Sequence, residues 1–121
     1  MKFFPYLRLE GNAREAVAFY EKAFQAENLG TITFGEMPSD PEYPLPEGAK
    51  DLVAHAAIKV GESLIMFSDT FPGESVQKGD MVTICVMFDD VEKARQSFEA
   101  LQEGGQVEMP LTETSFSLLM V

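Results

Sequence analysis

The chain has 121 residues, of which 45% are hydrophobic, so it is long and apolar enough for one domain with its own core. Its net charge is −11 and its nine Lys and Arg residues are scattered singly, which excludes the clustered basic footprint that nucleic acids and anionic membranes require. A single cysteine excludes an internal disulfide framework, and without a leader or long apolar run we expect a cytoplasmic protein.

The first residues predict a strand followed by an amphipathic helix. Residues 2–10 favour the strand, and Pro5 inside it restricts it to a sheet edge or a bulge. Asn12 is placed to cap the helix, with Glu15 completing a capping box. The helix carries one apolar stripe at three- and four-residue steps, formed by Ala13, Ala16, Val17, Tyr20, Ala23 and Phe24.

A second strand, a long loop and a hairpin follow. Residues 29–36 favour the strand, and residues 37–51 hold four of the seven prolines, which indicates either a binding loop or a surface excursion. Residues 52–60 and 63–69 predict two strands joined by the turn Gly61-Glu62. Alternation in the earlier of these strands assigns one set of side chains to the core, namely Leu52, Ala54, Ala56, Ile58 and Val60, and turns His55, Ala57 and Lys59 away from it.

The second half predicts another strand and helix. Residues 82–88 form an apolar strand pattern in which Cys85 is expected to be a buried small hydrophobe. Asp89 or Asp90 then caps a helix. The buried stripe of that helix is predicted to be Val91, Ala94, Phe98 and Leu101.

The strand–turn–helix unit is therefore written twice. Residues 5–20 (PYLRLEGNAREAVAFY) match residues 83–98 (TICVMFDDVEKARQSF), about 78 residues later. Recurrence at this spacing within one small domain predicts a duplicated module rather than a solenoid. We expect a single domain, 1–121, made of two modules at about 1–70 and 80–121 that enclose a groove.

The two modules are predicted to differ in length. After the second helix, which ends at Gly104-Gly105, only about 17 residues remain. They provide two strands, residues 106–113 and 115–121, and the second module is then shortened. Whether the chain ends naturally there or is truncated stays open. The final apolar run, SFSLLMV, would leave a sheet edge that invites pairing with another chain.

The order βαβββ, repeated, resembles the PhnB-like branch of the vicinal oxygen chelate superfamily, which includes glyoxalase I, bleomycin-resistance proteins and extradiol dioxygenases. The resemblance covers nearly the whole chain and is carried by PYLRLEGNAREAVAFY, GEMPSDPEYPLPEGAKDLVAHAAIKVGESLIMFSD and FDDVEKARQSFEALQEGGQVEMPLTET. It implies an α+β fold of paired βαβββ modules, usually homodimeric, whose sheets curl around a ligand cavity. Exchange of strands between two copies is one form that such a dimer could take.

The resemblance also implies where a metal would be held. Metal-dependent members use His or Glu from the first strand of each module and from the strands that close each sheet. Matching positions here carry Pro5, Thr83 and either Ile65 or Met66, while the last position either lies beyond residue 121 or has no counterpart. Proline, isoleucine and methionine do not ligate hard or borderline divalent cations. We therefore predict that the usual metal site is absent and that no cofactor is bound.

His55 is the only histidine and the only candidate catalytic residue. An imidazole titrates near neutrality, so it can act as a general base or orient a ligand, but a purely structural role is the interpretation that we favour for His55. Met-lined cavities accept varied apolar ligands. The predicted ligand-binding residues, which lie on the proposed strands, are His55, Met66, Ser68, Thr83, Cys85 and Met87.

Two charged residues have alternative interpretations. Asp69 ends its strand and is either a polar site residue or the start of a turn. Arg8 either neutralises an anionic ligand or pairs with Glu10 or another neighbouring acid, the interpretation that we favour.

Three functions follow from these expectations. The leading one is binding of a small, partly apolar molecule in the groove between the modules, without a metal, by a homodimer. The alternative is an enzyme of lyase or isomerase type that uses His55 as its base, so whether the protein is an enzyme stays undecided. The third is a strand-exchanged chain without a competent pocket.

Overall fold

The computed structural model describes residues 1–38, 48–71, 73–79 and 81–107. It has the predicted α+β character. In chain order the elements are β1 (Tyr6–Leu9), α1 (Ala13–Phe24), β2 (Glu27–Thr33), a 3-10 turn (Phe34–Glu36), β3 (Val53–Val60), β4 (Ser63–Asp69) and α2 (Val91–Leu101). None of the helices in these described ranges is long and apolar enough to cross a membrane.

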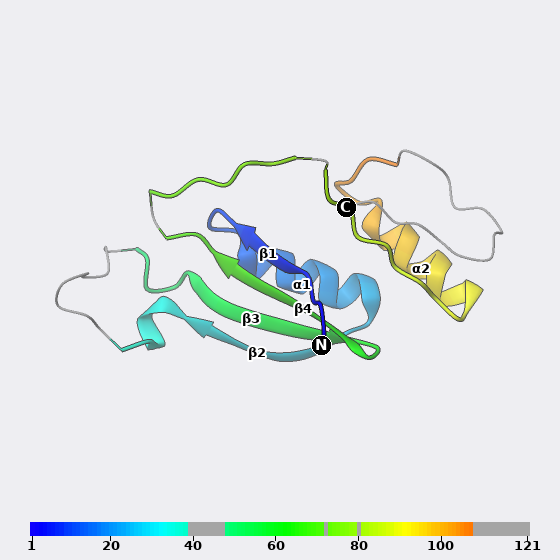
Figure 1. Cartoon of the computed structure of the whole chain (residues 1–121), viewed down its shortest axis with the longest axis horizontal. Helices are drawn as coiled ribbons and strands as arrows, with labels where there is room; N and C mark the ends of the chain where they lie inside the picture. Colours follow the sequence, from blue (N-terminus) through cyan, green and yellow to red (C-terminus); the bar gives the residue numbers. More distant parts are fainter. Residues whose placement is uncertain (39–47, 72, 80, 108–121) are drawn as a thin grey trace.

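Four strands form one sheet in the order β1-β4-β3-β2, with α1 packed against one face (Figure 1). β1 runs parallel to β4, and the other pairs are antiparallel. β1 is an edge strand, as Pro5 predicted, but it is shorter than the predicted strand at residues 2–10, because it begins only after Pro5. The prediction for residues 29–36 was wrong at its end, because Thr33 and Glu36 form a capping box that starts a 3-10 turn and ends β2.

The core lies between α1 and the sheet. Its largest fully buried side chains are Phe67, Ile58 and Val53, which pack with Ala13 and Val17 of the predicted helix stripe. The predicted core face of β3 was wrong at the start of the strand. A register irregularity, from His55 opposite Ile32 to Val53 opposite Thr33, places Val53 in the core and leaves Ala54 half-buried. The sequence alternation could not reveal this extra residue.

The turn between β3 and β4 forms as predicted. Val60 pairs with Ser63, so Gly61 and Glu62 make the two-residue connection, and Gly61 adopts a φ of +59° that favours glycine. This hairpin and β1 form the centre and one edge of the sheet.

Asp69 joins three elements at the N-terminus of α1. Its buried carboxylate accepts hydrogen bonds from the amides of Ala13 and Val53, each at 2.9 Å. The predicted cap was wrong, because Asn12 occupies the N-cap position but makes no side-chain hydrogen bond to the helix. A carboxylate from β4 takes that role, so Asp69 has a structural function.

The second half departs most from prediction. Residues 82–88 were predicted as a strand, but the described residues give them no strand partner. Ile84, Val86 and Phe88 are half-buried while the residues between them are exposed, so the alternating pattern persists without a ladder. Cys85 is exposed, which contradicts the expectation of a buried thiol. The strands predicted at 106–113 and 115–121 fall almost wholly outside the described residues, as does most of the loop 37–51.

α2 lies beyond one end of the sheet and contacts α1 (Figure 1). Asp90 caps it as predicted, since its Oδ1 accepts a hydrogen bond of 2.9 Å from the amide of Glu92. The buried residues are Ala94 and Ser97. Val91 was predicted to be buried but is 64% exposed at the first position of the helix.

Candidate functional site

Three of the predicted ligand-binding residues share the sheet face opposite α1, called the far face below. Phe67 and Ala56 pair with one another and are fully buried beneath α1. Since side chains alternate along a strand, their neighbours Met66, Ser68 and His55 point to the far face. β3 and β4 therefore bring these three residues together.

Tyr6 completes this group from β1. Its hydroxyl lies 3.3 Å from His55 Nδ1, and the two rings are tilted with centroids 5.9 Å apart. Tyr6 is also in register with Met66. Tyr6 is not among the ligand-binding residues predicted from the sequence. Alternation in YLRL could have placed it opposite Leu7 and Leu9, but the parallel pairing of β1 with β4 is not visible from local sequence.

The far face mixes apolar and polar groups. Tyr6 and Ile32 remain 46% and 49% exposed there, and His55 and Met66 are half-buried. An apolar surface beside a hydroxyl, an imidazole and a serine can pack against a partly apolar molecule while hydrogen-bonding its polar group.

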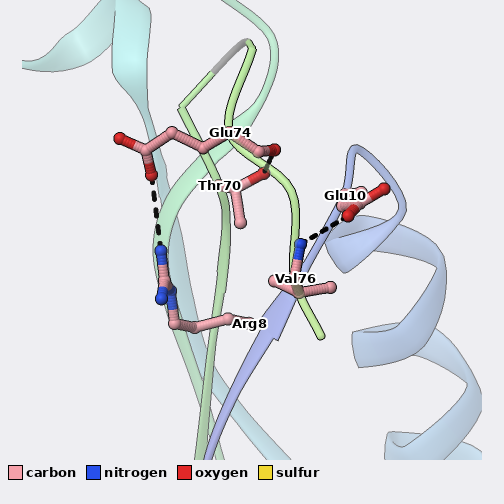
Figure 2. Close-up of polar contacts among 5 residues, drawn as sticks. All are labelled: Arg8, Glu10, Thr70, Glu74 and Val76. Atoms are coloured by element: carbon pink, nitrogen blue, oxygen red, sulfur yellow. Dashed lines mark hydrogen bonds and ion pairs between the residues drawn. The ribbon is translucent and has the colours of Figure 1, made fainter. Parts of the chain in front are cut away.

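Arg8 lies on the same face, in register with Ser68, and is engaged by an acid (Figure 2). Its Nη2 lies 3.4 Å from Glu74 Oε2, so the favoured interpretation, a neighbouring acid, is confirmed. Glu74 is anchored in turn, since its backbone oxygen accepts from the Thr70 hydroxyl at 3.1 Å. Glu10 instead accepts from the Val76 amide. These contacts bind the segment after β4 to β1.

The structure places two of the inferred metal-ligand positions side by side. The Met66 amide donates to the Pro5 carbonyl oxygen at 3.0 Å, so these two positions are neighbours in the structure. Neither side chain fits a hard or borderline divalent ion. Within the described ranges, no group of three or more His, Cys, Asp and Glu side chains is arranged to hold a metal.

The other predicted residues stand apart from the far face. No hydrogen bond or ring contact among the described residues joins Thr83, Cys85 or Met87 to His55. Thr83 and Cys85 are exposed. Met87 instead lines a cavity of about 740 Å³ on the helix side of the sheet, which the sequence did not indicate.

One titrating group is perturbed by its surroundings. Burial raises the pKa of the Tyr20 phenol, because the charged form loses hydration against the core. Tyr20 lies on α1 and stacks on Phe67 and Phe24. It is therefore a core group rather than part of the far face.

Comparisons with known proteins agree with this architecture. The profile described as Glyoxalase/Bleomycin resistance protein/Dioxygenase superfamily matches residues 5–121. Protein YjdN of Escherichia coli (strain K12) is 35% identical in an alignment that spans 94% of this chain and 81% of YjdN. The crystal structure of protein PA1353 from Pseudomonas aeruginosa superposes with a TM-score of 0.78 at 32% identity, over 94% of this chain and 81% of that one. The PhnB protein of Bacillus cereus gives a TM-score of 0.70 at 21% identity, over 98% and 95% of the two chains, a likeness in fold alone.

Proposed function

Since the chain belongs to the Glyoxalase/Bleomycin resistance protein/Dioxygenase superfamily, we propose that it binds a small, partly apolar molecule against the far face, in a groove between modules at about 1–70 and 80–121. The observation that carries this proposal is the convergence of His55, Met66 and Tyr6, linked by the contact between Tyr6 and His55. Met66 and Tyr6 supply apolar contact, and His55 supplies hydrogen bonding.

We also propose that binding proceeds without a divalent ion at the family's usual positions. The support is the chemistry of Pro5 and Met66, which are adjacent but cannot coordinate such an ion. Calorimetric titration of the protein with Zn²⁺ and with Mn²⁺ should then give no stoichiometric binding. One ion bound per chain, with Met66 and His55 resonances shifted, would overturn this part of the proposal.

The binding site can be tested by NMR with two local probes. The chain has one histidine and seven methionines, so ¹⁵N-histidine and ¹³C-methyl-methionine labels report His55 alone and Met66 after assignment with Met66→Leu. Titration with phenol, benzoate and cyclohexanol tests small molecules that combine a ring with one polar group. We expect saturable shifts at His55 and Met66 for at least one of them.

A matched pair of variants makes this test specific. Tyr6→Phe keeps the ring but removes the hydroxyl that contacts His55, and should weaken binding several-fold. Lys22→Gln, an exposed residue of α1 on the opposite side of the sheet, should leave binding unchanged. If neither probe shifts with any of the three molecules, or if both variants have the same effect, the far face is not the site.

A second candidate function, an enzyme of lyase or isomerase type, is favoured by the same contact. When His55 Nδ1–H donates to the Tyr6 hydroxyl oxygen, Nε2 keeps the lone pair that can accept a proton from a substrate. The ¹⁵N shifts of the His55 ring distinguish this tautomer from the other. Once a substrate is identified, His55→Ala should abolish its turnover while the protein stays folded. An unaltered rate would remove this candidate function.

The partner that we propose is a second copy of the chain. Ile32 and Tyr6 on the far face are about half exposed. They lie on β2 and β1, the two edge strands of the sheet, where another chain can pair. Light scattering should therefore give a dimer mass, and Ile32→Lys should shift it toward the monomer. A strict monomer at high concentration argues against both a simple dimer and strand exchange.

A further inference from the structure

We propose that the cavity on the helix side of the sheet is a second small-molecule site, separate from the far face, and that it takes a molecule with an apolar body and a cationic group. Its volume of about 740 Å³ is in the range of small-molecule sites. Four segments border it: the end of α1, the turn between β3 and β4, residues 86–89 and the first turns of α2. None of the far-face residues lines it.

The inner wall of the cavity is apolar. Phe24 from α1, together with Val86 and Phe88, is half-buried there. Val86 and Phe88 line it from the segment before α2, next to Met87. Ala23 and Ser97 close the wall and are only 4% and 5% exposed. A ring of six atoms can pack against this wall and remove it from water.

The rim of the cavity is acidic. Glu62, from the turn between β3 and β4, and Asp89, before α2, supply two carboxylates, and Lys93 is the one basic residue among the lining side chains. Lys93 follows Asp89 by four positions, a spacing at which opposite charges offset one another. The lining then carries one net negative charge within a chain of net charge −11. A cation is favoured over an anion at such a rim.

The cavity also spans a junction that a ligand could hold together. Gln25, at the end of α1, donates through Nε2 to Gln96 Oε1 of α2 at 3.4 Å, and both residues line the cavity. This is a long, exposed hydrogen bond between the two helices. A molecule that contacts both sides would add to the contact between the two helices.

The test compares three molecules that share a phenyl ring: 2-phenylethylamine as the cation, 2-phenylethanol as the neutral form and 3-phenylpropionate as the anion. Each is titrated into the full chain labelled with ¹³C-methyl methionine, with the Met87 methyl assigned by Met87→Leu. We expect saturable shifts at Met87 and not at Met66, with affinity falling from cation to neutral to anion. Since the rim is solvent-exposed, the difference between cation and anion should be about three- to tenfold.

Two variants and a control complete the experiment. Glu62→Gln lies at the exposed rim, cannot disturb the core, and should bring the cation and the neutral molecule closer together in affinity. Ser97→Leu fills the cavity and should weaken all three molecules about tenfold or more. Glu99→Gln, an exposed α2 residue outside the lining, should change nothing.

The outcomes separate this site from the one on the far face. Shifts at Met66 and His55 without shifts at Met87 would assign these molecules to the far face and overturn the second site. Equal affinity for all three molecules would overturn the cationic class. The site itself would be overturned if none of the three molecules shifted the Met87 methyl at about 10 mM, because ordinary fragments bind with millimolar dissociation constants and would be detected at that concentration.

Discussion

Two regions of the molecule share one sequence pattern, a strand followed by an acidic or polar turn and an amphipathic helix. The first region contains β1 and α1 within the four-stranded sheet, and the second contains residues 82–88 and α2. In the first, the strand is hydrogen-bonded into a sheet and the helix covers a core that contains Phe67. In the second, residues 82–88 keep only the alternation of a strand, and the buried residues of α2 are the small Ala94 and Ser97. The difference teaches that a sequence pattern determines which side chains can be buried, whereas pairing with a neighbouring strand determines whether those side chains are buried.

The same contrast separates two carboxylates at helix N-termini. Asp69 is 5% exposed and binds amides from α1 and β3, elements far apart in the sequence. Asp90 is exposed and binds an amide only two residues away. One carboxylate therefore fixes tertiary structure, whereas the other stabilises only its own helix.

The largest expected effect tests how much side chains of the two regions contribute to stability. Phe67→Ala removes a fully buried ring and should lower the free energy of unfolding by about 3–5 kcal/mol. Met87→Ala removes a side chain that is 75% exposed and should change the free energy of unfolding by less than about 0.5 kcal/mol. Urea unfolding followed by circular dichroism measures both. Comparable losses in the two variants would mean that residues 82–88 contribute to the core as fully as β4 does.

The two carboxylates give the next effect. Asp69→Ala leaves two buried amides without an acceptor and should lower the free energy of unfolding by about 3 kcal/mol, since each unsatisfied group costs about 1–3 kcal/mol. Asp90→Ala should lower it by about 1 kcal/mol, the usual effect of losing an exposed cap. The measurement is urea unfolding of both variants at pH 7. A loss at Asp90 equal to that at Asp69 would contradict the distinction between local and tertiary capping.

The sequence predicted the first four strands and both helices well because their burial patterns are local. The stripe of α1 and the turn at Gly61 each need only a few neighbouring residues to be recognised. What it could not predict depends on residues far apart in the chain. Val53 enters the core through a bulge in its pairing with β2, and Ala13 receives its cap from Asp69, 56 residues later.

The candidate site divides in the same way. Alternation placed His55 on the face away from α1, and the register of β3 with β4 places Met66 and Ser68 there too. Tyr6 was missed because its contact with His55 needs the parallel pairing of β1 and β4. Met87 was grouped with His55 because residues 82–88 were assumed to be a strand, whereas it borders the cavity on the helix side.

A smaller effect sharpens the comparison through pH. Because burial raises the pKa of Tyr20 above its ordinary value of 10.0, the folded state favours the neutral phenol. Its contribution to stability is therefore complete below pH 10.0 and is lost as the pH rises through the folded-state pKa. Urea midpoints measured across the alkaline range should fall for the natural chain and fall less for Tyr20→Phe. An identical fall in both proteins would place the alkaline loss elsewhere.

The smallest effect concerns two ion pairs of equal length. Arg8 and Glu74 join β1 to the segment after β4, while Arg95 and Glu92 are three residues apart on α2, and both N–O distances are 3.4 Å. All four side chains are more than half exposed, so Arg8→Gln and Arg95→Gln should each lower the free energy of unfolding by less than about 1 kcal/mol, and by still less in high salt.

Hydrogen exchange distinguishes the two ion pairs where the free energy of unfolding cannot. Arg8→Gln should speed exchange of the Glu74 amide, which bonds to Phe71, because the segment after β4 loses an anchor to β1. Arg95→Gln should affect α2 alone, and faster exchange at Glu74 in that variant would show that the two regions are coupled more tightly than their contacts indicate.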